Sequence, residues 1–501
     1  MTEQSKTNGL GLVLKDVFKH SIVYGITSSL QSVVGFVLLP ILTSYISPDL
    51  FGVYSILLLM AALTSAIFYL GASSALGRFY FDEDGIAYRR AIVSTAFFVT
   101  VFGALLLIGL AIGFADTISY WLFSTKAYAL HVILSLSGSA VGFLLNLMAI
   151  ILRYQKKSIA FLTVSSTGLV INFVVTYYLL TRANYQILAP IYGSIISNGF
   201  CFVLLLLLSL KLIRVKFDGR YFKSILSFGV QASAIGLLFY ILEWVDRLII
   251  KELLDLKSVG IYSLGYRIAA LVNILFVTPF SLIWAPTRME YARKENAKAL
   301  MTKISSYYSA VGVLFVLSGL LFGNDVMWIL FKNHDYHEAA QVFPIVMLAN
   351  LLFGYQNILD IGIHISKKLY FYIIISALSI TINIGLNYLL IPVFGYMAAA
   401  YVTLLTYLFS ATASYLIANR YYRIHLEPGR LISLFVCTIA VYLFSWFFRY
   451  QLQPAFFVLK LLLFGVLITF FYRYWLRKEE HAYVAVGIRR LCGFFSTKQK
   501  I

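Results

Sequence analysis

Long apolar runs separated by short polar segments are the dominant pattern along this chain of 501 residues. The runs reach about 20 residues, which is the length that an α-helix needs to cross a hydrocarbon core of ~30 Å. They lack the alternation of apolar and polar positions that is typical of membrane β-strands. The pattern predicts fourteen transmembrane helices at 21–45, 52–76, 91–115, 128–152, 159–181, 187–210, 224–250, 259–285, 304–331, 337–363, 370–392, 396–418, 431–448 and 455–475.

The charges in the loops support this number of helices. Lys and Arg collect on the cytoplasmic side of short loops, so basic and non-basic loops should alternate along the chain. One side of the predicted membrane holds six Lys and Arg residues, whereas the other loops and the two termini hold most of the 40 in the chain. If one helix were missed or wrongly added, every later loop would be assigned to the opposite side of the membrane. We therefore expect an even number of helices, with both termini in the cytoplasm.

The chain also contains an internal repeat. The motif FGVYS (Phe51–Ser55) returns after 208 residues as VGIYS (Val259–Ser263). A Lys pair followed by an Asn returns after 211 residues, so that Lys156–Lys157 and Asn172 correspond to Lys367–Lys368 and Asn383. A duplicated membrane bundle is typical of transporters. Because each copy contains six predicted helices, both copies should enter the membrane in the same orientation, with a cavity between them.

The predicted fold is therefore an all-α polytopic membrane protein, with two parallel six-helix repeats around a central cavity and two extra C-terminal helices. The expected segments are a cytoplasmic N-terminal interfacial segment (1–20), an N-terminal six-helix bundle (21–215), a C-terminal six-helix bundle (216–420), transmembrane helices 13 and 14 (421–478) and a basic cytoplasmic tail (479–501).

Composition excludes several other classes of protein. Hydrophobic residues make up 61% of the chain and charged residues 12%, compared with roughly 25% charged residues in soluble domains. The net charge of +19 is scattered over short loops, so we explain it by membrane topology and expect no nucleic-acid partner. The three cysteines lie far apart and predict no metal site. No loop is long enough to hold a catalytic domain, so we expect neither an enzyme nor a cofactor.

Charged residues inside the predicted helices are candidates for function, because a charge at the bilayer centre costs about 2.5–3.5 kcal/mol on insertion scales. They gather in the seventh and eighth helices, as Glu243, Asp246, Arg247 and Arg267. Glu243 and Arg247 are four residues apart and can pair along one helix, and Arg267 lies at a depth where it could meet Glu243 or Asp246. Two interpretations stay open. The cluster either locks the two helices together, or it binds an anionic substrate through an arginine and a coupling cation through an acid.

Four further charged positions lie outside this cluster. Asp360, in the tenth helix, either binds a coupling ion or reaches water at the inner surface. Arg78 and Arg288 lie 210 residues apart at the predicted cytoplasmic mouth of each copy. Arginine suits phosphate because its planar fork donates two parallel hydrogen bonds, although membrane topology also predicts arginines there. Lys460, in the last helix, is expected to extend towards the headgroups.

Asparagines inside the predicted helices, Asn172, Asn383 and Asn387, also allow two interpretations. In a wet cavity their amides would form hydrogen bonds with sugar hydroxyls. Between helices they would instead stabilise packing.

Two stretches of the sequence resemble a known family. YGITSSLQSVVGFVLLPILTSYISPDLFGVYS, followed by LGASSALGRFYF, resembles the N-terminal signature of bacterial polysaccharide-biosynthesis flippases, which include O-antigen transporters. WVDRLIIKELLDLKSVGIYSLGYRI, with SLIWAP, resembles the start of their second half. The superfamily of multidrug, oligosaccharidyl-lipid and polysaccharide exporters also includes lipid II flippases. The resemblance implies two six-helix bundles around a cavity that opens alternately to each side, and an undecaprenyl-pyrophosphate-linked oligosaccharide as the cargo. It also implies that pyrophosphate would be held by arginines, here Arg78, Arg247, Arg267 and Arg288.

The leading interpretation is a flippase that moves a lipid-linked oligosaccharide from the cytoplasmic to the outer leaflet of a bacterial inner membrane, for O-antigen, capsule or exopolysaccharide synthesis. Expected partners are this cargo and membrane lipids, with a polysaccharide polymerase and its chain-length machinery as candidates. Glu243, Asp246 and Asp360 are the candidates for coupling to H⁺ or Na⁺. Two alternatives stay open, a cation-coupled multidrug exporter of the same superfamily and a nontransport scaffold of a polysaccharide assembly complex.

Overall fold

The computed structural model describes residues 34–213, 219–292, 297–448, 454–476 and 481. Nearly all of these residues are helical, and none of them forms a β-strand. Thirteen helices in this part of the chain are long and apolar enough to cross a membrane, and a shorter apolar helix, Val34–Tyr45, covers the described end of the first predicted span. The predicted all-α membrane fold is confirmed. The expected interfacial segment at 1–20 and, apart from His481, the basic tail lie outside the described residues.

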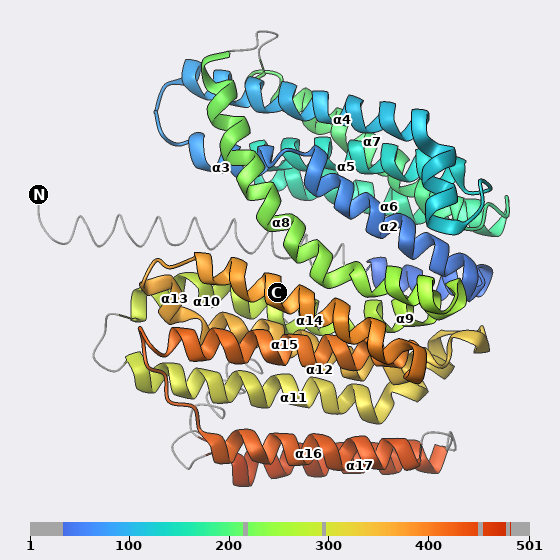
Figure 1. Cartoon of the computed structure of the whole chain (residues 1–501), viewed down its shortest axis with the longest axis vertical. Helices are drawn as coiled ribbons and strands as arrows, with labels where there is room; N and C mark the ends of the chain where they lie inside the picture. Colours follow the sequence, from blue (N-terminus) through green and yellow to red (C-terminus); the bar gives the residue numbers. More distant parts are fainter. Residues whose placement is uncertain (1–33, 214–218, 293–296, 449–453, 477–480, 482–501) are drawn as a thin grey trace, which may run out of the picture.

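The first group of helices lies in the upper part of Figure 1. It contains α2 (Pro48–Phe68), α3 (Ala72–Phe79), α4 (Ile86–Phe123), α5 (Ala129–Tyr154), α6 (Ser158–Thr181) and α7 (Leu188–Ser209). The second predicted span, 52–76, is not one continuous helix. Leu70 and Gly71 have positive φ angles of 52° and 58°, and this left-handed turn separates α2 from α3.

The second group lies below the first in Figure 1. It contains α9 (Leu256–Ala269), the π-helical turn η1 (Asn273–Val277), α10 (Thr278–Tyr291), α11 (Ala297–Leu330), the short turn η2 (His334–Tyr336), α12 (Ala339–Leu359), α13 (Ile361–Ile365), α14 (Tyr370–Phe394) and α15 (Met397–Ala418). The eighth and tenth predicted spans therefore also contain breaks, since the eighth consists of α9, η1 and α10 and the tenth of α12 and α13.

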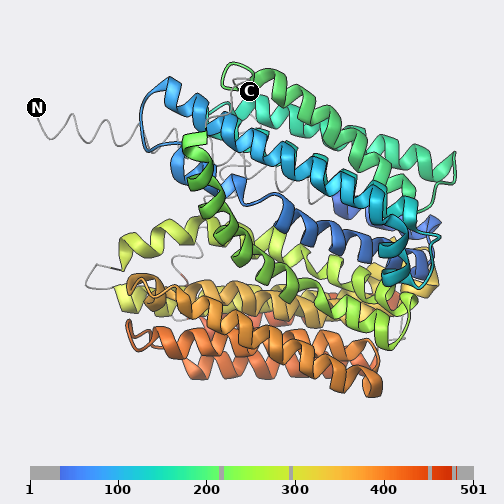
Figure 2. The same ribbon diagram turned by 45° about the horizontal axis from the view of Figure 1, so that its top comes forward.

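Helix α8 (Gly219–Leu253) links the two groups, as Figure 2 shows from a second direction. It packs against α2, α3 and α4 of the first group and against α9 and α14 of the second. At the crossing with the first group, a Cβ on Gly229 would lie 2.1 Å from the carbonyl oxygen of Leu70. This position requires glycine because the two backbones touch. The expected domain boundary at 215 to 216 stays a prediction, since α8 contacts both groups.

The last two helices form a separate layer at the bottom of Figure 1. Both α16 (Pro428–Phe447) and α17 (Pro454–Phe470), which continues into η3 (Phe471–Trp475), pack against α11. Lys460 of α17 lies 2.6 Å from Asp325 of α11, measured from Nζ to Oδ2, and both side chains are buried. The expectation that Lys460 extends towards the headgroups is wrong, because a buried carboxylate pairs with it.

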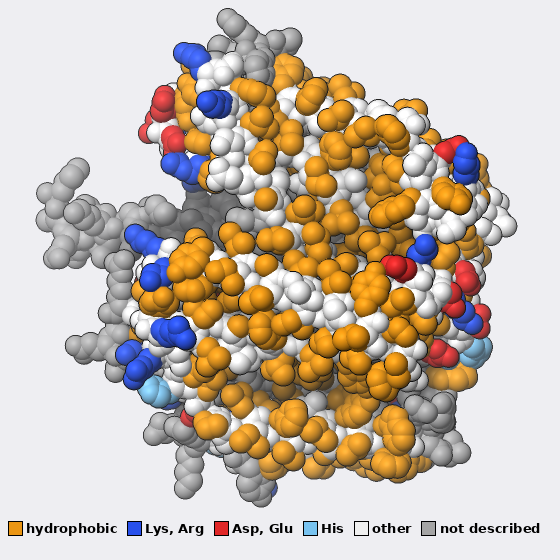
Figure 3. All heavy atoms as spheres, in the orientation of Figure 1, with side chains coloured by type: hydrophobic (Ala, Val, Ile, Leu, Met, Phe, Trp, Pro, Cys, Tyr) orange, Lys and Arg blue, Asp and Glu red, His pale blue; other side chains and the backbone are white. Residues whose placement is uncertain are grey.

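The charged side chains lie at the two ends of the molecule, with an apolar band between them (Figure 3). Lys and Arg gather near α3 and α13, at the end that we call the basic end. At the opposite end, which we call the far end, acidic and basic side chains are mixed. This arrangement is that of a multi-pass membrane protein, whose apolar band faces lipid.

Candidate transport pathway

The FGVYS and VGIYS motifs meet each other at the far end, where α2 of the first copy packs against α9 of the second. A Cβ on Gly52 would lie 2.0 Å from the carbonyl oxygen of Leu256, and one on Gly260 would lie 1.9 Å from that of Pro48. Neither position has room for a side chain. The repeat therefore has a structural reason, because the two glycines allow the backbones of the two copies to touch.

A second contact closes the same end. The hydroxyl of Tyr336, from η2, donates a hydrogen bond to the carbonyl oxygen of Ile46 at 2.8 Å. The ring of Tyr336 also packs edge-on against Phe51, with 5.9 Å between ring centroids, and both side chains are fully buried. Nothing in the sequence pattern singles out Tyr336. Its partners come from a segment 290 residues earlier in the chain.

Arg267 belongs to this junction between the copies. Its guanidinium lies 5.2 Å from the ring centroids of both Phe51 and Tyr54, which belong to α2. Such cation–π contacts contribute about 0.5–2 kcal/mol, depending on how far the charge is desolvated. Among the described residues no carboxylate pairs with Arg267, so the expected contact with Glu243 or Asp246 is absent there.

Asp246 and Arg247 form a buried pair on α8, and each is 2% exposed. Arg247 Nη1 lies 3.0 Å from Asp246 Oδ1, and the hydroxyl of Tyr262 donates to the other carboxylate oxygen. The guanidinium is also sandwiched between two rings, at 4.3 Å from the centroids of both Trp244 and Tyr266. In this conformation the pair holds α8 against α9.

Glu243 differs from its neighbours because its side chain is exposed. Its backbone carbonyl, at 2.9 Å, accepts a hydrogen bond from Arg247. The two side chains do not form a direct ion pair, because Asp246 is the nearer acid and pairs with the guanidinium, so Glu243 interacts with Arg247 only at longer range. The carboxylate of Glu243 instead accepts a hydrogen bond from the side chain of Trp244, on a helix that contacts both groups.

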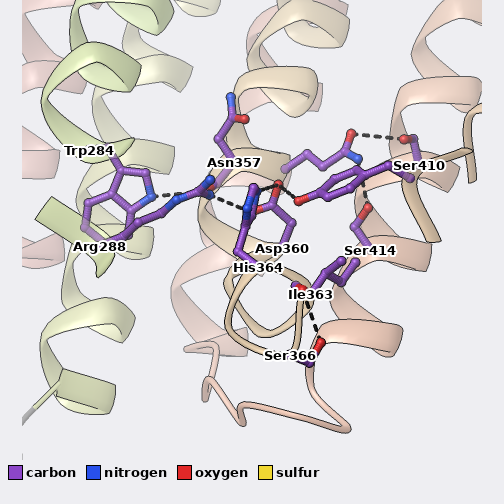
Figure 4. A network of polar contacts seen from close by, with 11 residues as sticks. Trp284, Arg288, Asn357, Asp360, Ile363, His364, Ser366, Ser410 and Ser414 are labelled. Atoms are coloured by element: carbon purple, nitrogen blue, oxygen red, sulfur yellow. Dashed lines mark hydrogen bonds and ion pairs between the residues drawn. The ribbon is translucent and has the colours of Figure 1, made fainter. Parts of the chain in front are cut away.

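A second buried network connects α10, α12 and α14 near the basic end (Figure 4). Arg288 Nη1 lies 2.7 Å from Asp360 Oδ1, and the hydroxyl of Tyr372 donates to Asp360 Oδ2 at 2.5 Å. Arg288 also donates to the backbone carbonyl of Asn357, which accepts a further hydrogen bond from Trp284. Arg288 is 8% exposed and Asp360 3% exposed. Two predicted candidates thus form one ion pair.

Arg78, the repeat partner of Arg288, has a different environment. Its side chain is 54% exposed and lies 2.6 Å from the carboxylate of Asp82, one helical turn along the chain. An exposed pair of this kind exchanges partners easily, because water screens its attraction. The two copies therefore place equivalent arginines in unlike surroundings.

The first group contains two adjoining cavities of about 530 and 440 Å³. The larger lies between α2, α3, α5, α7 and α8, and the smaller lies between α5, α6 and α7. They share Gly142, Asn146 and Asn198, and the smaller one also reaches Asn172 and Arg153. Of these residues, Asn172 alone was a candidate from the sequence.

The second group contains a cavity of a different kind. Its volume is about 660 Å³, it lies between α11, α12, α15 and α16, and its lining is almost entirely apolar or aromatic. The asparagines of this group do not reach it. Asn387 donates to Asn383 Oδ1 at 3.0 Å, and both are buried, so they contribute to helix packing.

Comparison with known proteins identifies the family. A family model described as "Polysaccharide biosynthesis protein" matches residues 41–316. The chain belongs to this family. The probable flippase AglR of Haloferax volcanii is 27% identical over 175 residues, which are 33% of this chain and 35% of that protein. The match thus spans about a third of this relative's length.

Two solved structures show the fold. The lipid II flippase MurJ, in an inward closed conformation, superimposes with a TM-score of 0.75 and 16% identity, over 91% of this chain and all of that one. A multidrug resistance MATE transporter, in an inward-facing conformation, gives a TM-score of 0.62 and 15% identity, over 78% of this chain and 94% of that one. At these identities the likeness concerns the fold alone. The predicted family and the predicted all-α membrane fold are both confirmed.

Proposed function

We propose that this protein is a flippase that carries an undecaprenyl-pyrophosphate-linked oligosaccharide from the cytoplasmic to the outer leaflet of a bacterial inner membrane, for O-antigen, capsule or exopolysaccharide synthesis. The proposal rests on one observation, the match of a polysaccharide-biosynthesis family model to a chain with a transporter fold. The relatives AglR and MurJ both carry the name flippase. Membrane lipids are the expected surroundings, and a polysaccharide polymerase with its chain-length machinery would be the partners in the same pathway.

The physical task of such a protein is to shield a polar head. Hydroxyl and phosphate groups lose their hydrogen bonds with water on entering hydrocarbon, at a cost of several kcal/mol for each unpaired group. A polar cavity in one half would receive the head, while the apolar cavity of the other half offers room for part of the lipid chain. If the basic end faces the cytoplasm, as the distribution of Lys and Arg favours, the contacts of Gly52 and Tyr336 close the outer side in this state.

The four arginines would then have different roles. Arg78 is exposed and paired only with an exposed acid, so it is the best placed to meet a diphosphate. Arg267 would come next, because its charge lies on aromatic rings and has no acidic partner among the described residues. Arg247 and Arg288 are buried in ion pairs and would reach cargo only in another conformation.

Among the three acids, Glu243 would couple transport to H⁺ or Na⁺. Asp246 and Asp360 each share a buried arginine, which neutralises their charge. Glu243 is exposed on α8, the helix that contacts both groups. A charge that moves across a membrane potential of 100 mV gains about 2.3 kcal/mol, which is enough to bias a conformational change.

The test is reconstitution in liposomes that contain a fluorescent polyprenyl-diphosphate oligosaccharide. We expect the wild-type protein to transfer the probe between leaflets, and Glu243→Gln to transfer it without stimulation by an imposed ion gradient. Protein-free liposomes and heat-unfolded protein are the controls. Absence of transfer by a folded wild-type protein, with efflux of a cationic dye retained, would overturn the proposal.

That last outcome would favour a multidrug exporter, which the likeness to a MATE transporter keeps as the second candidate. A binding site for a cationic drug needs a carboxylate in or near it. Among the described residues that line the two cavities of the first group, there is no Asp or Glu. This composition favours a neutral or anionic head over a cationic drug.

A further inference from the structure

Three amides from three neighbouring helices converge on the adjoining cavities of the first group. They are Asn146 of α5, Asn172 of α6 and Asn198 of α7. Asn198 donates to Ser194 at 3.3 Å, but neither Asn146 nor Asn172 has a hydrogen-bond partner within the described part of the chain. An unpaired amide inside a membrane protein costs free energy unless water or a ligand satisfies it. The geometry thus provides donors and acceptors for a polar guest.

The second copy supplies an internal comparison. Asn383 lies 211 residues after Asn172, at the repeat-equivalent position. It is 1% exposed and accepts a hydrogen bond from Asn387, so its amide serves packing. Asn172 lines a cavity instead. The same residue at the same repeat position is therefore exposed to a cavity in one copy only, and packing between helices does not explain it there.

We propose that the two adjoining cavities of the first group form the binding site for the glycan of the cargo, an inference that rests on the flippase function proposed above. Amide groups suit sugar hydroxyls because both donate and accept hydrogen bonds. Tyr69 and Phe143 line the larger cavity as a stacked pair, with 5.5 Å between ring centroids. Phe143 is buried, so the half-buried ring of Tyr69 is the one that would pack against the apolar C–H face of a sugar ring. Both cavity volumes lie in the range of ~300–1,000 Å³ that is usual for small-molecule sites.

The charge distribution gives the bound glycan a direction. Arg153 ends α5 at the basic end, lines the smaller cavity and places its guanidinium 5.2 Å from the ring centroid of Phe161. The diphosphate that links glycan to lipid carries negative charge. It would therefore lie at the basic end, where both Arg153 and the exposed Arg78 are found, with the sugars extending towards Asn146 and the larger cavity.

The experiment measures binding of two lipids to the purified full-length protein in nanodiscs, a polyprenyl-diphosphate oligosaccharide and the same polyprenyl diphosphate without sugars. Asn146→Leu and Asn172→Leu keep the side-chain volume but remove the amide. Each should weaken binding of the glycan-bearing lipid by about five- to tenfold, because a hydrogen bond contributes about 1 kcal/mol. Binding of the sugar-free lipid should stay unchanged. Arg153→Gln should weaken binding of both lipids.

Thr167→Val is the matched control, since Thr167 lies on α6 like Asn172 but is exposed and does not line the cavities. Unfolding temperatures of all variants check that they fold. Wild-type affinity of both Asn variants for the glycan-bearing lipid would overturn the inference, as would an equal loss for both lipids. If the wild-type protein transfers cargo while the variants bind normally, the inference alone fails. If the wild-type protein neither binds nor transfers the cargo, the proposed function fails with it.

Discussion

Arg78 and Arg288 show how two equivalent residues come to differ in function. Arg288 pairs with Asp360 in a buried network, whereas Arg78 pairs with Asp82 at the surface. Removing one partner of a buried ion pair costs about 3–5 kcal/mol, because it leaves the other charge unpaired. An exposed pair contributes at most about 1 kcal/mol. The exposed pair leaves Arg78 able to exchange partners, as the proposed contact with a diphosphate requires, whereas Arg288 stabilises the contact between α10 and α12.

We therefore predict opposite effects of two alanine substitutions. Arg288→Ala should lower the unfolding temperature strongly, and Asp360→Asn in the same chain should restore part of the loss by removing the unpaired charge. Arg78→Ala should leave the unfolding temperature nearly unchanged but reduce transfer of a diphosphate lipid in liposomes. Unfolding of the purified variants, followed by tryptophan fluorescence, measures the first effect. Equal loss of stability in the two single variants would contradict this account.

At the scale of residues, the charged positions are evident from the sequence, but their partners are not. Asp360 and Arg288 are 72 residues apart, and Lys460 and Asp325 are 135 residues apart. Such pairs depend on which helix faces lie together, and an apolar run does not specify its neighbour. Glu243 does not pair directly with Arg247 for a local reason, because the adjacent Asp246 competes for the same guanidinium.

At the scale of elements, the positions of the helices were predictable because each span must be apolar over about 20 residues. The breaks inside them were not predictable. Leu70, Gly71 and the π-helical turn η1 lie within runs that stay apolar, so hydropathy continues across them. Tertiary contacts fix these breaks, as the approach of Gly229 to Leu70 illustrates.

The attachment of α17 to α11 is a prediction at the same scale. Lys460 and Asp325 form a buried ion pair between these helices, and the ring of Phe322 lies 5.8 Å from that of Phe464 beside it. Lys460→Leu leaves a carboxylate unpaired in an apolar layer, so α17 should separate from α11. Lys460→Leu with Asp325→Leu should keep it attached, because replacing both partners of a buried pair by apolar residues is often neutral.

Cross-linking measures this attachment. Phe322→Cys and Phe464→Cys, introduced into a chain without its three native cysteines, should form a cross-link in the parent and in the double leucine variant. The yield should fall severalfold in Lys460→Leu alone. Equal yields in all three proteins would show that apolar packing suffices to hold α17.

At the scale of the whole molecule, the two copies share a scaffold but contain different cavities. One has an amide-lined pair of cavities and the other an apolar cavity. The sequence predicted the internal repeat, the family and the all-α membrane fold, because repeat spacing and motifs can be recognised directly in a sequence. The sequence could not predict this asymmetry, since Asn172 and Asn383 occupy equivalent positions in the repeat. Only the packing of their helices determines which of them lines a cavity.

At the scale of the whole molecule, we also expect the two repeat glycines to control whether the far end is closed. Gly260→Val places a side chain where the backbone of α2 now lies, 1.9 Å from the carbonyl oxygen of Pro48. The closed state loses stability, whereas a state with separated ends does not, so the population should shift towards opening at the far end. Tyr336→Phe removes one contact of about 1 kcal/mol and should shift the population in the same direction by a smaller amount.

A cysteine at Ala62, which lines the larger cavity, introduced into a chain without its three native cysteines, reports this shift through its reaction with a membrane-impermeant thiol reagent added on the far side. We expect about a tenfold faster reaction in Gly260→Val, corresponding to ~1.4 kcal/mol, and a smaller increase in Tyr336→Phe. Gly109→Val is the matched control, because a Cβ on Gly109 meets nothing within 4 Å. Unchanged rates in both test variants would mean that the far end opens without separating the two glycines. The repeat would then stabilise the fold but would not form the gate.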